Sequence, residues 1–189
     1  MTQVKKSEIK DRILLGAHRV FRQKTYQAAT ISDIAETAGV TPSNIYNYYR
    51  SKFDLFYDVY ANYIIARLNS LTDEVRRLQT PRAKVERVLE VLWKDLPNDA
   101  DGLSRNLIQA VATASKDEQK PRFLLKWCED LVCNLLRESV PPERRPLLQD
   151  SSLAFLIWMA FDGFSVNAGM GEERDMQRLI GNFCDLLLG

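Results

Sequence analysis

Six side chains between positions 43 and 52 carry groups that bind nucleic acids. They offer hydroxyl, amide, phenol and ammonium groups, which hydrogen-bond to phosphate oxygens and to base edges in a DNA groove. We expect Asn47 to read a base, because an amide can pair with N6 and N7 of adenine. No arginine precedes Arg50 in this stretch, so arginine–guanine contacts from positions 41–48 are excluded. The six are Ser43, Asn44, Tyr46, Asn47, Tyr48 and Lys52.

Two short helices joined by a glycine turn are expected to position these side chains. Thr30 can cap the first helix, and Gly39 stands where a helix ends in a left-handed residue. Thr41 can cap the second helix, whose first position suits Pro42. Ile45 would then anchor this second helix to the core. Such a pair is a helix-turn-helix, and it leaves the polar side chains facing outward.

The stretch 30–56, together with the helix before it, resembles the helix-turn-helix of the TetR/AcrR family. The resemblance covers about residues 8–57, with Ala17 and Phe21 at core positions of the first helix. The residues that carry it are Ile34, Ala35, Ala38, Gly39, Val40, Thr41, Ile45, Tyr46, Tyr48, Tyr49, Lys52 and Leu55.

The resemblance implies a role for each matched position. Ser43, Asn44 and Asn47 would face the groove, while the two tyrosines 46 and 48 would clamp backbone phosphates. Packing is the alternative for Tyr46, capping is the alternative for Ser43, and Tyr49 is expected in the core. Lys52 begins the next helix, whose free N–H groups also favour a phosphate. The full DNA-binding set is Thr30, Ser32, Thr41, Ser43, Asn44, Tyr46, Asn47, Tyr48 and Lys52.

The whole chain reads as all-α, with apolar residues recurring at the helical period and no hairpin signals. We expect a three-helix helix-turn-helix domain over residues 1–52 and a larger helical ligand-binding and dimerisation domain over 53–189. About nine helices are predicted, at 7–24, 31–38, 42–48, 52–78, 81–96, 103–114, 115–139, 147–168 and 175–188.

The helix predicted over 147–168 is apolar on nearly every side, so it must be covered on two sides. The resemblance implies that the last two helices, about 147–188, pair with those of a second copy. Such a homodimer would bind a palindromic operator in double-stranded DNA.

The resemblance also implies a pocket for a small, largely apolar effector, either cationic or aromatic. Ordinary core packing is the alternative for each of its residues. The candidates are Tyr63, Trp93, Trp127, Phe155, Met159 and Asp162.

Composition and charge exclude several other classes of protein. Residues 1–60 hold nine Lys and Arg against six Asp and Glu, a net charge of +3, whereas residues 61–189 hold 17 against 19, a net charge of −2. The three cysteines show no C-x-x-C spacing, and no membrane span, cofactor or metal site is indicated. One histidine, His18, and the lack of catalytic motifs argue against an enzyme.

The sequence therefore predicts a cytoplasmic, DNA-binding transcriptional regulator, preferably a repressor that its effector releases from DNA. The alternative is a regulator or nucleoid-associated factor that a protein partner controls, or one that acts without a small-molecule effector.

Overall fold

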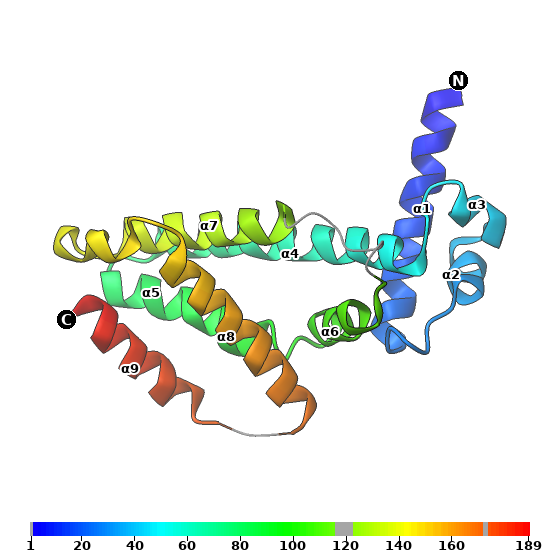
Figure 1. Cartoon of the computed structure of the whole chain (residues 1–189). Helices are drawn as coiled ribbons and strands as arrows, with labels where there is room; N and C mark the ends of the chain where they lie inside the picture. Colours follow the sequence, from blue (N-terminus) through cyan, green and yellow to red (C-terminus); the bar gives the residue numbers. More distant parts are fainter. Residues whose placement is uncertain (1, 116–122, 172–173) are drawn as a thin grey trace. The chain divides into compact units, whose positions relative to one another are not determined.

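The computed structural model describes residues 2–115, 123–171 and 174–189, and these residues form helices and no β-strand (Figure 1). The all-α prediction is therefore confirmed. The α-helices are α1 (Thr2–Gln23), α2 (Ile31–Ala38), α3 (Pro42–Tyr46), α4 (Lys52–Arg77), α5 (Pro81–Glu90), α6 (Leu103–Thr113), α7 (Phe123–Ser139), α8 (Ser152–Gly169) and α9 (Met176–Leu188). A π-helical turn, Val91–Asp95, continues α5, and a 3-10 helix, Pro142–Leu148, precedes α8.

Several helix ends differ from the sequence prediction. The helix predicted from residue 147 begins only at Ser152. Residues 147 and 148 belong to the preceding 3-10 helix, and the Asp150 carboxylate accepts a hydrogen bond from the Ser152 N–H at 2.9 Å. The predicted helix 81–96 changes to π geometry after Glu90. The first part of the helix predicted over residues 115–139 falls on residues 116–122, which lie outside the described residues.

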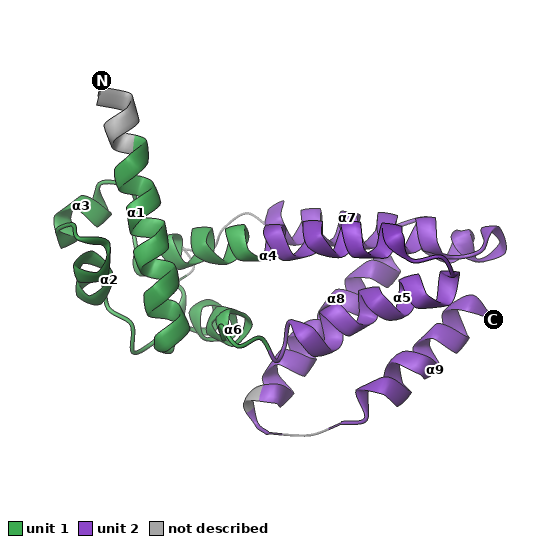
Figure 2. Cartoon of the chain, turned by 180° about the vertical axis from the view of Figure 1, so that it is seen from behind, with its two compact units in different colours: residues 1–63, 99–120 green, residues 64–98, 121–189 purple. Residues whose placement is uncertain are grey.

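The chain divides into two compact units (Figure 2). Unit 1 comprises residues 1–63 and 99–120, and unit 2 comprises residues 64–98 and 121–189. In this division α6 joins the N-terminal helices, and α4 contributes its first part to unit 1 and the rest to unit 2. The domain boundary at residues 52 and 53 stays a prediction.

Unit 1 is built around α1, which packs along α2. The rings of Phe21, Tyr26 and Phe56 form a buried cluster, with Phe21 edge-on to Phe56 at 4.9 Å between centroids. A β-carbon at Gly16 would lie 2.8 Å from the Ala38 β-carbon, closer than real contacts allow. Glycine at position 16 therefore lets α1 and α2 approach.

Unit 2 packs α5 against α7 and α9, and α8 against the π-helical turn. Trp93 lies at the centre of these contacts: its indole N–H donates to the Ile157 carbonyl at 3.0 Å, and its ring meets Phe183 edge-on at 5.1 Å. Because the indole N–H has this hydrogen-bond partner, Trp93 can be buried without leaving its polar atom unpaired. Within the described residues, no helix combines the length and apolar content that crossing a membrane requires.

Candidate nucleic-acid interface

The second helix of the helix-turn-helix, α3, is held by a reciprocal cap. The Thr41 hydroxyl accepts from the Asn44 N–H at 3.2 Å, and the Asn44 side-chain oxygen accepts from the Thr41 N–H at 3.3 Å and the Thr41 hydroxyl at 3.0 Å. Pro42 occupies the first position, as predicted. The capping residue is therefore Thr41 and not Ser43. The side-chain oxygen of Asn44 is already engaged in this cap.

The first helix, α2, has a similar cap that includes a charge. The Thr30 hydroxyl accepts from the Asp33 N–H at 3.1 Å, and the Asp33 carboxylate accepts from the Thr30 N–H at 3.0 Å. Lys24 lies 2.9 Å from the same carboxylate. Hydrogen bonds from Lys24 and then from Thr30 lower the pKa of Asp33 to about 2, so the carboxylate stays charged at neutral pH.

The turn between the two helices is fixed by Gly39 and by a residue far away in the sequence. Gly39 has φ +64°, the left-handed conformation predicted for it. Arg12 on α1 donates to the carbonyls of Ala38 and Gly39 at 2.8 and 2.6 Å. These carbonyls end α2 and lack helical partners, so the guanidinium completes the turn.

One side of α3 is anchored and the other is open. Ile45 is 1% exposed, whereas Tyr46 is 57% exposed and Ser43 and Asn47 are exposed as well. Tyr48 is half-buried. Tyr49 is buried, which confirms its expected place in the core. The exposed groups are those that the sequence analysis assigned to phosphates and bases.

Lys52 forms hydrogen bonds within the protein that were not predicted from the sequence. Its ammonium donates to the carbonyls of Tyr26 and Ala29 at 2.7 and 2.9 Å and lies 4.4 Å from the centre of the Tyr26 ring. Desolvation lowers the pKa of Lys52. The lysine therefore ties the start of α4 to the loop between α1 and α2, and its contact with a phosphate stays a prediction.

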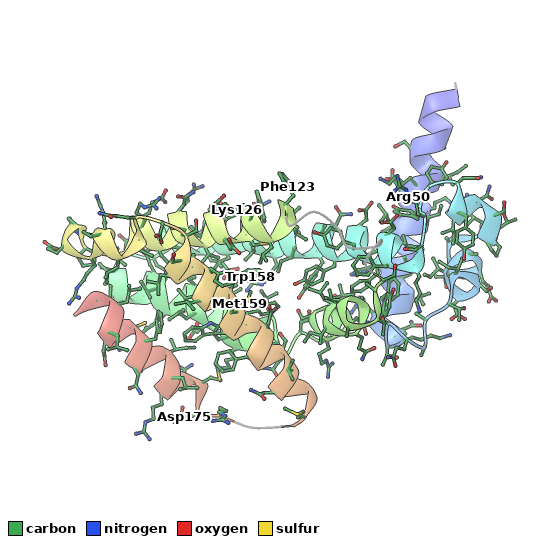
Figure 3. The ribbon with its side chains drawn as sticks, viewed as in Figure 1. Arg50, Phe123, Lys126, Trp158, Met159 and Asp175 are labelled. Carbon is green, nitrogen blue, oxygen red and sulfur yellow. The ribbon has the colours of Figure 1, made fainter. Side chains whose placement is uncertain are left out.

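The N-terminus of α4 is already capped by side chains. The Ser51 hydroxyl accepts from the Asp54 N–H at 3.2 Å. The Asp54 carboxylate accepts from the Arg50 N–H at 3.2 Å, which places a negative charge where a phosphate was expected. The exposed Arg50 side chain is a further basic group beside this helix start (Figure 3).

The predicted effector residues fall in both units. Tyr63 belongs to unit 1, where its hydroxyl donates to Asp99 at 2.5 Å. The others belong to unit 2: Trp93 is buried, Trp127 and Met159 are half-buried, and Phe155 is 40% exposed. Trp158 and Met159 follow one another on α8 (Figure 3).

Asp162 is the most unusual of the candidate effector residues. It stands on the apolar helix α8, is half-buried, and has no hydrogen-bond or ion-pair partner in the described part of the chain. Burial raises the pKa of Asp162 to about 6. Such a carboxylate is poised to accept a cation or a hydrogen-bond donor.

Residues 13–59 match the sequence profile described as "Bacterial regulatory proteins, tetR family". The N-terminal segment of the chain is therefore that of a TetR-family regulator. Its matched residues include the whole helix-turn-helix, α2 and α3, and the start of α4.

Three relatives are named as transcriptional regulators. The activator FasR of Mycolicibacterium smegmatis is 21% identical over 69% of this chain and 60% of its own length. The regulator YfiR of Bacillus subtilis is 25% identical over 92% and 86%, and the repressor BepR of Brucella suis is 25% identical over 63% and 49%. The chain thus spans less than two thirds of FasR and of BepR.

Solved structures share the fold over almost the whole chain. The fatty acid degradation regulator FadR from Bacillus halodurans is 22% identical with a TM-score of 0.68, covering 95% of this chain and 97% of its own. FadR from Bacillus subtilis, in complex with stearoyl-CoA, is 17% identical with a TM-score of 0.65 over 94% and 97%. A regulator from Saccharomonospora viridis, in complex with choline, is 19% identical with a TM-score of 0.66 over 95% and 96%.

Lys52→Met should lower the free energy of unfolding by about 1–3 kcal/mol, since two charge-assisted hydrogen bonds are lost while the aliphatic stem is kept. Urea unfolding measures this. Lys10→Met is the matched control, because Lys10 forms an exposed ion pair with Asp58 at 3.7 Å and a distant contact with the Tyr49 ring, 5.8 Å from its centre. Its loss should lower the free energy of unfolding by less than about 1 kcal/mol. Equal stability of the two variants would contradict the structural role of Lys52.

Proposed function

We propose that this TetR-family chain is a sequence-specific repressor that binds a palindromic operator as a homodimer and leaves it when a small, largely apolar, cationic effector binds. The observation that carries the proposal is the open face of α3, where Ser43, Tyr46 and Asn47 are exposed above the buried Ile45. Polar groups on a rigid helix can enter a major groove and contact both phosphates and base edges.

Within this face, Asn47 is best placed to read bases. The Asn44 side-chain oxygen is engaged in the cap with Thr41, whereas the Asn47 side chain forms no hydrogen bond in the described part of the protein. A free amide keeps both its donor and its acceptor for adenine. Tyr46 offers one hydroxyl, which suits a phosphate oxygen and carries no sequence information.

Asn47→Ala should reduce the preference for the operator over scrambled duplexes, whereas Tyr46→Phe should weaken binding to both alike. The first change removes a base contact worth about 1–3 kcal/mol of discrimination, and the second removes a phosphate contact. Competition binding at fixed salt separates the two effects. Identical behaviour of the two variants would contradict the assignment of roles.

The homodimer is proposed on α8 and α9, which expose large apolar side chains in the single chain. On α8 these are Leu156 and Val166, at 62% and 44% exposure, and Met170, directly after the helix, is 69% exposed. Gly163 lies among them with open space around its α-carbon, so a second helix can come close there. On α9, Leu179 and Leu186 are 37% and 76% exposed.

The exposed apolar side chains of α8 and α9 favour a second copy of this chain as their binding partner. Apolar residues spaced along two neighbouring helices in sequence suit the same helices of a twin, because a twofold axis pairs each patch with itself. Such a dimer would present two α3 helices about 34–36 Å apart, one turn of DNA. The palindromic operator follows from that symmetry.

Leu156→Glu should convert the dimer to a monomer without unfolding the chain, because the side chain is already exposed. Leu15→Glu is the matched control: Leu15 is 61% exposed on α1, in unit 1. Sedimentation velocity measures the mass of each. A Leu156→Glu protein that sediments as the wild type does would contradict the proposed interface.

The effector is proposed to place a cation against Asp162. Asp162 stands on the apolar helix α8 and has no partner in the described part of the chain, so it offers one charge on an otherwise apolar helix. Two of the related structures contain ligands, stearoyl-CoA and choline, and the charge of Asp162 favours the cationic kind. An effector of this kind would act by binding more tightly to the state that cannot bind the operator.

Tetraphenylphosphonium, an apolar cation, should bind about tenfold more tightly at pH 7 than at pH 5, because Asp162 loses its proton near pH 6 and only the carboxylate attracts a cation. Asp162→Asn should bind weakly and lose this pH dependence. Binding is measured at each pH by titrating the cation into the protein without DNA and following tryptophan fluorescence.

Triphenylphosphine oxide, which is neutral, is the control ligand and should show no pH dependence with either protein. Equal binding of the cation by wild type and Asp162→Asn would overturn the cationic class of effector. Operator binding in the absence of any ligand response would favour control by a protein partner.

A further inference from the structure

A buried side chain of helix α6, Asn106, forms hydrogen bonds with the end of α1 and with the loop that follows α1. It is 4% exposed, and its amide nitrogen donates to the carbonyls of Phe21 and Lys24 at 2.8 and 3.2 Å. Its oxygen accepts from the Tyr26 N–H at 2.8 Å. The amide thus closes the last turn of α1 and fixes the first residues of the loop that follows.

The loop from residue 24 to residue 30 is held from a second side by Lys52. The Tyr26 N–H donates to Asn106, while the Tyr26 carbonyl accepts from Lys52. The loop ends at Thr30, whose hydroxyl caps α2. Its position therefore determines where α2 begins, and α2 in turn supports α3.

The start of α6 is itself fixed within unit 1. The Asp99 carboxylate accepts from the Gly102 N–H at 2.6 Å and from the Tyr63 hydroxyl. Asp101 lies 2.6 Å from the Arg22 guanidinium of α1. The residues just before α6 are thus bonded to α1 and α4, and the Asn106 backbone N–H donates to the Gly102 carbonyl at 3.0 Å.

We propose that Asn106 is a positioning residue for DNA binding, which fixes the helix-turn-helix by holding the end of α1 and the following loop against α6. The proposal rests on the proposed function, since it concerns operator affinity. Removing the amide leaves two carbonyls and one N–H without their partner in a buried place, where lost hydrogen bonds are costly. The loop then relaxes, and α3 no longer fits the groove.

Three variants separate positioning from simple stability. Asn106→Leu removes all three hydrogen bonds and keeps the branching of the side chain. Asn106→Asp keeps the acceptor for Tyr26 but turns both donors into a carboxylate facing two carbonyls. Ser104→Ala is the control: Ser104 is 1% exposed on the same helix, and its hydroxyl has no hydrogen-bond partner in the described part of the chain.

The experiment compares each folded variant on two duplexes: the operator that the wild type selects, and a scrambled duplex of the same length. Hydrogen exchange at the Tyr26 amide is followed in the same samples. Both Asn106 variants should lose about tenfold or more in the ratio of operator to scrambled affinity. The Tyr26 amide should exchange faster in Asn106→Leu, and Ser104→Ala should match the wild type in every measurement.

A purely structural role would lower the melting temperature of the Asn106 variants and leave the affinity ratio of the folded protein unchanged, which would overturn the proposal. A wild type that selects no operator would instead overturn the proposed function. The two failures are therefore distinguishable.

Discussion

A helix of five residues cannot hold its shape alone in water, because nucleating a helical turn costs more than so few hydrogen bonds return. The DNA-facing helix α3 is five residues long, so its surroundings must fix it. The Thr41 cap orders its first turn, Ile45 anchors its inner side, and Arg12 closes the turn before it. Its outer side can then remain polar and exposed.

The same dependence extends outward through unit 1. The position of the turn depends on α2, which packs closely on α1 at Gly16. Lys52 holds the loop before α2. Asn106 adds α6 to this chain of contacts. Because the exposed groups that would meet DNA rest on so many contacts, a small displacement of one support can change how α3 meets DNA.

Local features of this structure could be predicted from the sequence, since neighbouring residues determine them. Thr30, Thr41 and Gly39 carry cap and turn signals that act within four residues, and the structure confirms each. The helical period of residues 147–168 likewise predicted a helix, which the structure places at Ser152–Gly169.

Contacts between distant residues could not be predicted in this way. Arg12 meets Gly39 across 27 positions, and Asn106 meets Tyr26 across 80. A single asparagine within an amphipathic helix gives no signal of its partners until the fold brings them together. Lys52 was expected to contact a phosphate because the sequence gives no sign of the carbonyls that it binds. These belong to residues 23 and 26 positions earlier in the chain.

The most direct measurement is selection of bound fragments from a pool of sheared genomic DNA, at near-physiological salt, with the unmodified protein. We expect recovery of one palindrome, or a few related ones, with half-sites about one helical turn apart. Recovery of unrelated fragments that dissociate as salt rises would show binding to the phosphate backbone alone, and would contradict sequence reading by α3.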